Sequence, residues 1–312
     1  MIASNDEQLK KLPRRLGLNG RKKAYLQKRE ELKRLAILSQ FCHLVSFTLK
    51  KPRTQLQCGA LITSIDIDVG SSQLGEKNRG RNDSNVNDYL PERYVGEMEE
   101  KAVPSLAKFF DELAIPVTFA VRGQLTEVEN SIMEPILDSP IEHEIAAHGY
   151  YHRSFTSLSK AEAKKELQLI SIGFQKLGLR PTSFVFPKNL VSHLDLLERF
   201  KYESFRDEGG LRKDGMFIRR KGQLYDVHPG FYLGAVYNPI FLTKIIDIAV
   251  TRRLPFHIWF HPHDIFEGGS VEKKIRRVFF PLYNYAKRKE REGTLKFETM
   301  QSIINEIKNA RS

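Results

Sequence analysis

Short apolar segments alternate with amphipathic stretches from Gly59 to the end of the chain, and this alternation constrains the fold more than any other feature. We expect strands at GALITSIDID (59–68), IPVTFAVRG (115–123), IEHEIAAHG (141–149), TSFVFP (182–187), YESFR (202–206), QLYDVHPG (223–230) and PFHIWFHPHD (255–264). Helices are expected at about 97–114, 157–178, 193–200, 238–253 and 270–292, and residues 294–310 read as a strand followed by a helix. Such alternation predicts a largely parallel α/β sheet covered by helices, either open or closed into a barrel.

Two segments between these elements have distinctive signals. Ser157 or Ser159 can cap the helix at 157–178, and Gly178 can end it. The Gly- and Asn-rich stretch 70–93 is too long for a simple connection, and long loops in compact domains are often functional.

The positive charge of the chain is concentrated at its start. Residues 1–53 hold 14 Lys or Arg against 4 Asp or Glu, which accounts for most of the net charge of +12. We therefore divide the chain into a basic, mainly helical extension (1–57) and an α/β domain (58–312). The extension is either a solvated basic helix or an arm attracted to an anionic surface. We expect peripheral contact with an anionic membrane, and no specific nucleic acid partner.

Other features limit the class of protein. No apolar run approaches the roughly 18 residues of a membrane span, and the apolar stretch 35–49 is too short to cross. We see no secretory signal, so a cytoplasmic location is expected. Cys42 and Cys58 are too few for a disulfide framework or a thiolate zinc site.

Candidate functional groups gather where the expected strands end. Asp66 and Asp68 end the first strand, His148 and His152 follow the third, and His261 and His263 end a late one. Functional groups collect at the carboxyl ends of parallel strands in both barrels and open sheets. This convergence carries more weight than any single motif.

The aspartates Asp66 and Asp68 stand two apart, and therefore on one face of a strand. Two carboxylates this close require a cation or a proton between them. The alternative is a strand-end turn with solvated acids. The spacing thus favours a cation site without proving one.

The pair His148 and His152 is weak evidence alone, because nine histidines make a four-residue spacing common and His257/His261 repeats it. On one helical turn, however, that spacing brings both imidazoles to one side. With one aspartate the pair would form an Asp-His-His metal site with an open position for water. Zinc is the default ion, although these ligands also accept cobalt or other divalent ions.

The segment 255–264 alternates apolar and polar residues. As a strand, it would place His257, Trp259, His261 and His263 on one face, toward a polar cleft, and Phe256, Ile258 and Phe260 on the other. His261 could then protonate a leaving group. For His263, a hydrogen-bonded loop histidine beside Asp264 is an equally good interpretation.

Taken together, SIDID, VTFAVRG, HEIAAHGYYHRSF, SFVFPKN and FHIWFHPHD resemble, in order and spacing, the polysaccharide deacetylase family (carbohydrate esterase family 4, the NodB-homology domain). The resemblance covers about residues 58–310. It implies a distorted (β/α) barrel that carries a metal-dependent N-deacetylase. It also implies that Asp66 is the catalytic base, that Asp68, His148 and His152 bind the metal, and that His261 is the general acid.

The chain departs from the family pattern in two places. Family members commonly have an Arg two residues before the Pro of the third motif, where this chain has Val185 before Pro187. Arg206 is the expected replacement. The Asp/Trp motif that precedes the last strand in the family is not evident, which leaves open what tunes His261. Residues expected to bind or orient the substrate are Pro187, Asn189, Arg206, Trp259 and His263.

The main functional hypothesis is removal of an N-acetyl group from a polymeric, oligomeric, lipid-linked or nucleotide-linked amino sugar. One alternative keeps the metal but hydrolyses another C–N bond, such as that of a cyclic imide or ureide. Another is a non-catalytic carbohydrate-binding relic. An aspartyl-phosphate phosphatase is disfavoured by Gly70 and would leave the histidines unused, and an Asp-x-Asp glycosyltransferase does not require the His pair.

The basic extension yields the first testable prediction. Residues 1–57 should co-sediment with vesicles that contain anionic lipid at low salt and be released at high salt, because screening weakens the attraction. Absence of binding at low salt would rule out membrane docking by this arm.

Overall fold

The computed structural model describes residues 56–68, 101–126, 132–207, 217–233, 239–266, 273 and 275–310. The predicted basic extension, apart from its last two residues, and the predicted loop 70–93 lie outside this part of the chain. Within it, no helix combines the length and the apolarity that crossing a bilayer requires.

The described residues contain one sheet of ten strands in the order β6-β7-β5-β4-β3-β2-β1-β9-β8, with β10 also paired to β1. Neighbours are parallel except for the hairpin β6–β7. The strands are β1 (Gly59–Ile67), β2 (Thr118–Val121), β3 (Glu144–Ala147), β4 (Ser183–Val185), β5 (Ser204–Arg206), β6 (Ile218–Lys221), β7 (Leu224–Val227), β8 (Phe231–Tyr232), β9 (Pro255–Phe260) and β10 (Leu295–Glu298).

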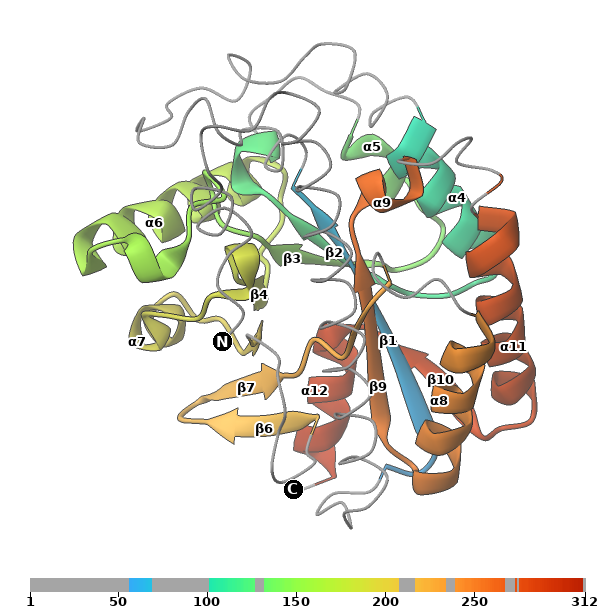
Figure 1. Cartoon of the computed structure of the whole chain (residues 1–312). Coiled ribbons are helices and arrows are strands. Elements are labelled where there is room, and N and C mark those ends of the chain that lie inside the picture. Colours follow the sequence, from blue (N-terminus) through green and yellow to red (C-terminus); the bar gives the residue numbers. More distant parts are fainter. Residues whose placement is uncertain are drawn as a thin grey trace, which may run out of the picture.

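Strand β1 is the centre of the sheet, beside β9 (Figure 1). Its first half pairs with β10 and its second half with β2, while β9 lies along its other edge. All nine of its residues are buried. A strand covered on both faces needs apolar residues at successive positions, which explains why GALITSIDI does not alternate.

The chain itself joins the two ends of this sheet. Strand β7 lies near one end of the strand order and β8 at the other, and only residues 228–230 separate them. Nδ1 of His257 lies 3.0 Å from the carbonyl oxygen of His228, which ties this crossing to β9. The sheet is therefore curved into a distorted barrel, as predicted.

Helices cover the outer face of the sheet. They are α4 (Val103–Glu112), α5 (Glu134–Leu137), α6 (Lys160–Lys176), α7 (Leu194–Arg199), α8 (Pro239–Arg252), α9 (Pro262–Phe266), α11 (Phe280–Arg291) and α12 (Met300–Asn309). Helices α8 and α11 pack together, and α8 lies on β1 and β9 (Figure 1). The hydroxyl groups of Tyr283 on α11 and Thr63 on β1 lie 2.9 Å apart, so the odd-numbered side chains of β1 face the helices. The even-numbered ones, including Ser64 and Asp66, face the barrel interior.

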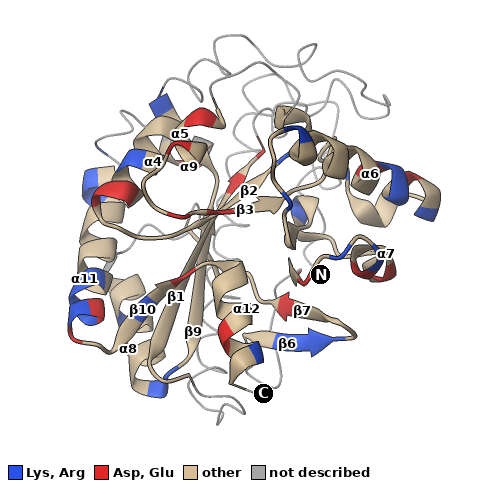
Figure 2. Cartoon of the chain, turned by 180° about the vertical axis from the view of Figure 1, so that it is seen from behind, with Lys and Arg blue, Asp and Glu red and all other residues tan. Residues whose placement is uncertain are grey.

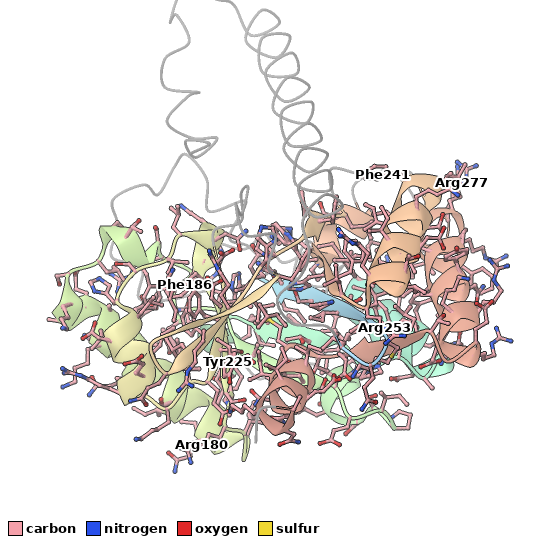
Figure 3. The ribbon with its side chains drawn as sticks, turned by 90° about the horizontal axis from the view of Figure 1, so that it is seen from below. Arg180, Phe186, Tyr225, Phe241, Arg253 and Arg277 are labelled. Carbon is pink, nitrogen blue, oxygen red and sulfur yellow. The ribbon has the colours of Figure 1, made fainter. Side chains whose placement is uncertain are left out.

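Charged and apolar side chains are separated accordingly. Lys and Arg mark the outer helices α6 and α11 and the strand β6 (Figure 2). With side chains drawn, Arg180 and Arg277 lie at the periphery, whereas Phe186 lies among packed side chains (Figure 3). Phe186 is fully buried and contacts the rings of Phe155 and Phe184. The layer between the sheet and the helices is therefore apolar, whereas the interior of the barrel holds a few charged side chains.

Several expected elements are found with shifted ends. Ser159 caps α6 through a capping box with Glu162, and Gly178 follows the helix at φ +70°. The prediction of a strand through residue 264 is wrong beyond Phe260, because Pro262 cannot donate to a strand ladder and instead begins α9. The predicted helix at 270–292 is interrupted, since a π-helical turn (Ile275–Phe279) precedes α11 and Pro281 lacks an N–H.

Some short elements have no clear signal in the sequence. Strands β6 and β8 are examples: β6 is largely exposed and charged, and β8 has two residues. The remaining short elements are 3-10 turns at Gly123–Thr126, Phe155–Ser157 and Pro187–Asn189.

Closure of the barrel depends on a glycine, which leads to a prediction. Gly230 has φ +62°, and a Cβ there would lie 2.0 Å from the carbonyl oxygen of His257. Gly178 has a similar φ of +70° but open space around it. Gly178→Ala should lower the free energy of unfolding by about 1 kcal/mol, from backbone strain alone. Gly230→Ala should lower it by about 3 kcal/mol or more, because the clash adds to the strain. Urea unfolding measures both, and equal losses would contradict the proposed closure.

Candidate active site

Three side chains from two strand ends converge on one point. Asp68 follows β1, and His148 and His152 follow β3. One ligand atom from each lies within 4.8 Å of the others, and Asp68 Oδ2 is 3.7 Å from His152 Nε2. The structure thus brings together the carboxylate and the two imidazoles that the sequence singles out. Such a group could hold a metal ion.

The two histidines meet through a loop and not through a helical turn, which corrects the expected geometry. Gly149 has φ +69° and His152 has φ +57°, so the chain reverses between them and the ring centroids come within 4.8 Å. A Cβ on residue 149 would lie 2.7 Å from Cγ of Pro187. Pro187, expected near the substrate, therefore packs beneath this loop.

A buried carboxylate on α6 holds the loop in place. Glu166 is fully buried, and its Oε2 accepts the backbone N–H groups of Tyr150 and Tyr151 at 2.8 and 3.1 Å. Its Oε1 accepts from Nε of Arg153 at 2.7 Å. Tyr150 and Tyr151 lie between the two histidines in the chain. By binding their backbone N–H groups, Glu166 fixes the spacing of the two imidazole rings.

The protonation of His148 suits a metal ligand. Its Nδ1 donates to the carbonyl oxygen of Val185 at 2.9 Å, which leaves the lone pair on Nε2. That Nε2 is buried and has no hydrogen-bond partner among the described residues. Burial, the largest influence, lowers the pKa of both His148 and His152, so the neutral forms are favoured. Two neutral imidazoles and a carboxylate form a donor set that fits zinc or a similar divalent ion.

Asp66 forms a buried ion pair with Arg206. Nη1 of Arg206 donates to Oδ1 of Asp66 at 2.7 Å, and Nη2 donates to Oδ2. Burial, the largest single influence, would raise the pKa of Asp66, but the Arg206 guanidinium together with His148 and His261 outweighs it, and the pKa lies below its usual value. Arg206 pairs in register with Val185 on the neighbouring strand. The cation missing at position 185 is therefore supplied by the adjacent position in the sheet.

Two other expected site residues hold this arginine. Oδ1 of Asn189 accepts from Nε and Nη2 of Arg206 at 3.1 and 3.0 Å. The indole ring of Trp259 lies 4.4 Å from the guanidinium carbon, within the range of a cation–π contact. Asn189 and Trp259 thus contact the ion pair, where the sequence led us to expect substrate contacts.

His261 lies on the other side of Asp68. Its Nε2 is 3.8 Å from Asp68 Oδ2, and its Nδ1 is 3.2 Å from Asp264 Oδ2. Tyr232 donates to the other oxygen of Asp264 at 2.6 Å. Burial lowers the pKa of His261, but Asp68 and Asp264 outweigh burial and raise it to about 9. Asp264 is hence the partner that the sequence left unassigned. The side chain of His263 lies outside the described part of the chain.

His257 does not line an open cleft, contrary to expectation. It is fully buried in the barrel interior, with Nε2 2.8 Å from the hydroxyl of Ser64. Burial is the main cause that lowers its pKa to about 3, and the neighbouring Arg206 adds to the effect. A neutral imidazole therefore lies beneath the Asp66–Arg206 pair.

Ser64, Glu166 and Tyr232 also contact the site, and none of them was expected from the sequence. A single Ser in a buried strand and a Glu in an amphipathic helix match ordinary patterns, so neither carries a signal. Asp264 does carry one, since it stands three residues after His261 and behind Pro262, which can start a helical turn.

Comparison with known proteins supports the family assignment. Residues 88–203 match the family model of polysaccharide deacetylases. The resemblance to the polysaccharide deacetylase family is thus confirmed over this segment of the chain. The matched segment includes His148 and His152, whereas Asp66, Asp68 and His261 lie outside it. No curated protein sequence matches the chain.

Solved structures share the fold of this polysaccharide deacetylase-like chain. A Mycobacterium smegmatis protein described as a candidate polysaccharide deacetylase aligns with 84% of this chain and 94% of its own, at 18% identity and a TM-score of 0.62. Puue allantoinase aligns with 79% of this chain and 89% of its own, at 12% identity and a TM-score of 0.55. A 4-alpha-glucanotransferase from Thermococcus litoralis aligns with 80% of this chain and 40% of its own, at 13% identity and a TM-score of 0.55. At these identities the likeness concerns the fold alone.

The low pKa of His257 predicts a pH dependence of stability. In the unfolded chain the imidazole binds a proton below its ordinary pKa of 6.5, whereas the buried ring stays neutral down to about pH 3. The unfolded state then binds more protons, so the stability associated with this ring is lost as the pH falls from about 6.5 toward about 3. Between about pH 7.5 and pH 5.5, the wild type should lose about 1.4 kcal/mol more unfolding free energy than His257→Gln.

Urea unfolding at the two pH values measures this difference, and the other buried histidines contribute equally to both proteins. Equal losses in the wild type and in His257→Gln would show that the ring is not held neutral.

Proposed function

We propose that this protein is a metal-dependent hydrolase that removes the N-acetyl group from an amino sugar. The observation that supports this most strongly is the arrangement around Asp68. Asp68 lies 3.8 Å from the positively charged imidazole of His261, and the ionised carboxylate of Asp66 is close enough to influence the pKa of both His148 and His261. A base, an acid and a candidate metal site thus lie side by side, which is what hydrolysis of an amide requires.

The metal ligands would be Asp68, His148 and His152, and zinc is the ion that this donor set favours. When bound, such an ion lowers the pKa of a coordinated water and polarises an acyl oxygen. The chain's own contribution is to present two neutral imidazoles and one carboxylate with little rearrangement. The Val185 carbonyl and Glu166 supply this preorganisation, because they fix the His148 tautomer and the loop.

Asp66 would act as the base that accepts a proton from the attacking water. Its bidentate pairing with Arg206 keeps it ionised and limits its rotation, and two of its lone-pair directions remain for a proton. Arg206 positions this carboxylate and is not a proton carrier, since a guanidinium stays charged in proteins.

His261 would act as the acid that protonates the departing sugar amine. Asp264 accepts a hydrogen bond from Nδ1, so the proton on Nε2 is the one that points toward Asp68. The backbone N–H of His261 also donates to Asp264 at 2.8 Å, and this second contact fixes the ring near the turn that begins α9. The proposed acid therefore carries a proton on both ring nitrogens and has a defined ring orientation.

The proposed substrate is an N-acetylated saccharide, as the family match implies. The basic charge of residues 1–57 favours an anionic surface as the place of action. A lipid-linked or nucleotide-linked saccharide at the cytoplasmic side would suit such a location better than a finished polymer.

Two substitutions test the roles of base and ligand. Asp66→Asn should bind zinc with the wild-type stoichiometry but lose at least about 100-fold in kcat, because the amide cannot accept the proton. His148→Ala should lose the metal and, with it, turnover. Acetate release from N-acetylglucosamine derivatives, together with metal analysis of each purified protein, measures both effects.

The same assay separates the competing functions. Ring opening of a cyclic ureide or imide without acetate release would replace the proposed substrate while keeping the metal. Saccharide binding that is unchanged in Asp66→Asn, with no turnover in the wild type, would show a carbohydrate-binding relic.

A further inference from the structure

We infer that Ser64 and His257 are positioning residues that hold Arg206, and through it Asp66, in the geometry needed for catalysis. The inference rests on the proposed function, since it assigns Asp66 as the base. Among the described residues, their side chains bond each other, Arg206 and the His228 carbonyl. Both act from the layer of the barrel interior beneath the site.

Every N–H group of the Arg206 guanidinium has an acceptor. Nη1 donates to Asp66 Oδ1 and to the hydroxyl of Ser64, at 2.7 and 3.0 Å. Nη2 donates to Asp66 and Asn189, and Nε donates to Asn189. A guanidinium has five N–H donors, and all five are used by these acceptors. Any other orientation of the group would break some of these hydrogen bonds. Ser64 is the acceptor that holds the inner edge of this group.

The direction of each hydrogen bond beneath Arg206 is determined by chemistry. The carbonyl oxygen of His228 can only accept, so the His257 Nδ1 that lies 3.0 Å from it carries the proton. In a neutral ring, Nε2 must then be an acceptor, and the Ser64 hydroxyl donates to it at 2.8 Å. With its proton committed to His257, Ser64 turns a lone pair toward Nη1 of Arg206.

This chain of contacts crosses the interior of the barrel from one closure point to the base. It begins at His228, between β7 and β8, passes through His257 on β9 and Ser64 on β1, and ends at Arg206 on β5. Ser64 and His257 are both fully buried. Apolar residues could fill this volume without the cost of burying polar groups. We therefore attribute to Ser64 and His257 the role of orienting Arg206.

A matched pair of substitutions on β1 tests this role in the full-length, zinc-loaded protein. Ser64→Ala and Thr63→Val each remove one buried hydroxyl from adjacent positions. Thr63 faces the helices and bonds Tyr283, whereas Ser64 faces Arg206. We expect Ser64→Ala to lower kcat for acetate release roughly 10-fold with KM and zinc content unchanged, and Thr63→Val to stay within about 2-fold of wild type.

A second pair tests His257. His257→Gln keeps an acceptor for the Ser64 hydroxyl, and His257→Phe removes it. Activity should be retained largely in the Gln variant and lost by roughly 10-fold in the Phe variant, with the zinc content of both unchanged. Equal kcat values in Ser64→Ala and Thr63→Val, or in the two His257 variants, would overturn the inference.

Side-chain nitrogen NMR keeps this test separate from the proposed function. The Arg206 Nη resonances, assigned with Arg206→Lys, should be resolved and slowly exchanging in the wild type and in Thr63→Val, and averaged in Ser64→Ala. If the wild type releases no acetate, the proposed function fails while this spectrum still judges the positioning role. Averaged resonances already present in the wild type would overturn that role.

Discussion

The ion pair between Asp66 and Arg206 is the interaction on which the polar interior of this barrel depends. Both side chains are almost completely buried, and removing two charges from water costs several kcal/mol for each ion. Such a cost is offset only when geometry and further hydrogen bonds are good. Here the carboxylate is bound at both oxygens, and the guanidinium uses every donor and also lies against Trp259. Residues from several strands are thus committed to keeping one carboxylate ionised and fixed beside the candidate metal site.

The same ion pair explains a departure from the family pattern. An arginine can pair with Asp66 from more than one position in the barrel interior, because its side chain is long and its planar guanidinium matches a carboxylate. Position 185, where the family commonly has Arg, lies directly beside Arg206 in the parallel register of β4 and β5. An arginine on the neighbouring strand thus supplies a guanidinium to Asp66 although residue 185 is apolar. The main-chain carbonyl of Val185 accepts the hydrogen bond from His148.

What could be predicted from the sequence follows the strength of its local signals. Strands buried on both faces need continuous apolar runs, so β1 and β9 could be predicted from the sequence. The helix α6 could also be predicted, because Ser159 marks its N-terminus. The convergence of Asp68, His148 and His152 could also be predicted, because parallel strands bring their carboxyl ends to one edge of the sheet. The search for a cation to replace Val185 leads to Arg206 for the same geometric reason.

The remaining contacts depend on features that have no local pattern. The loop between His148 and His152 relies on two positive φ angles and on Glu166, a residue of a distant helix. Ser64 meets His257 only after the sheet has curved, and Tyr232 belongs to a strand of two residues. Alternation fails at His261 because Pro262 ends the strand, and the helical turn that follows places Asp264 within reach of the imidazole.

The charges around Asp68 suggest why His261 has a carboxylate of its own. Without an ion, Asp68, Asp264 and Asp66 all favour the protonated imidazole, and burial opposes them. A divalent cation held by Asp68 would reduce the contribution of that carboxylate to the pKa of His261. Asp264 lies on the far side of the ring, bonds Nδ1 directly and is itself held by Tyr232. The pairing with Asp264 is therefore the part of the arrangement that would keep His261 charged in a metal-loaded site, where the proposed mechanism needs an acid.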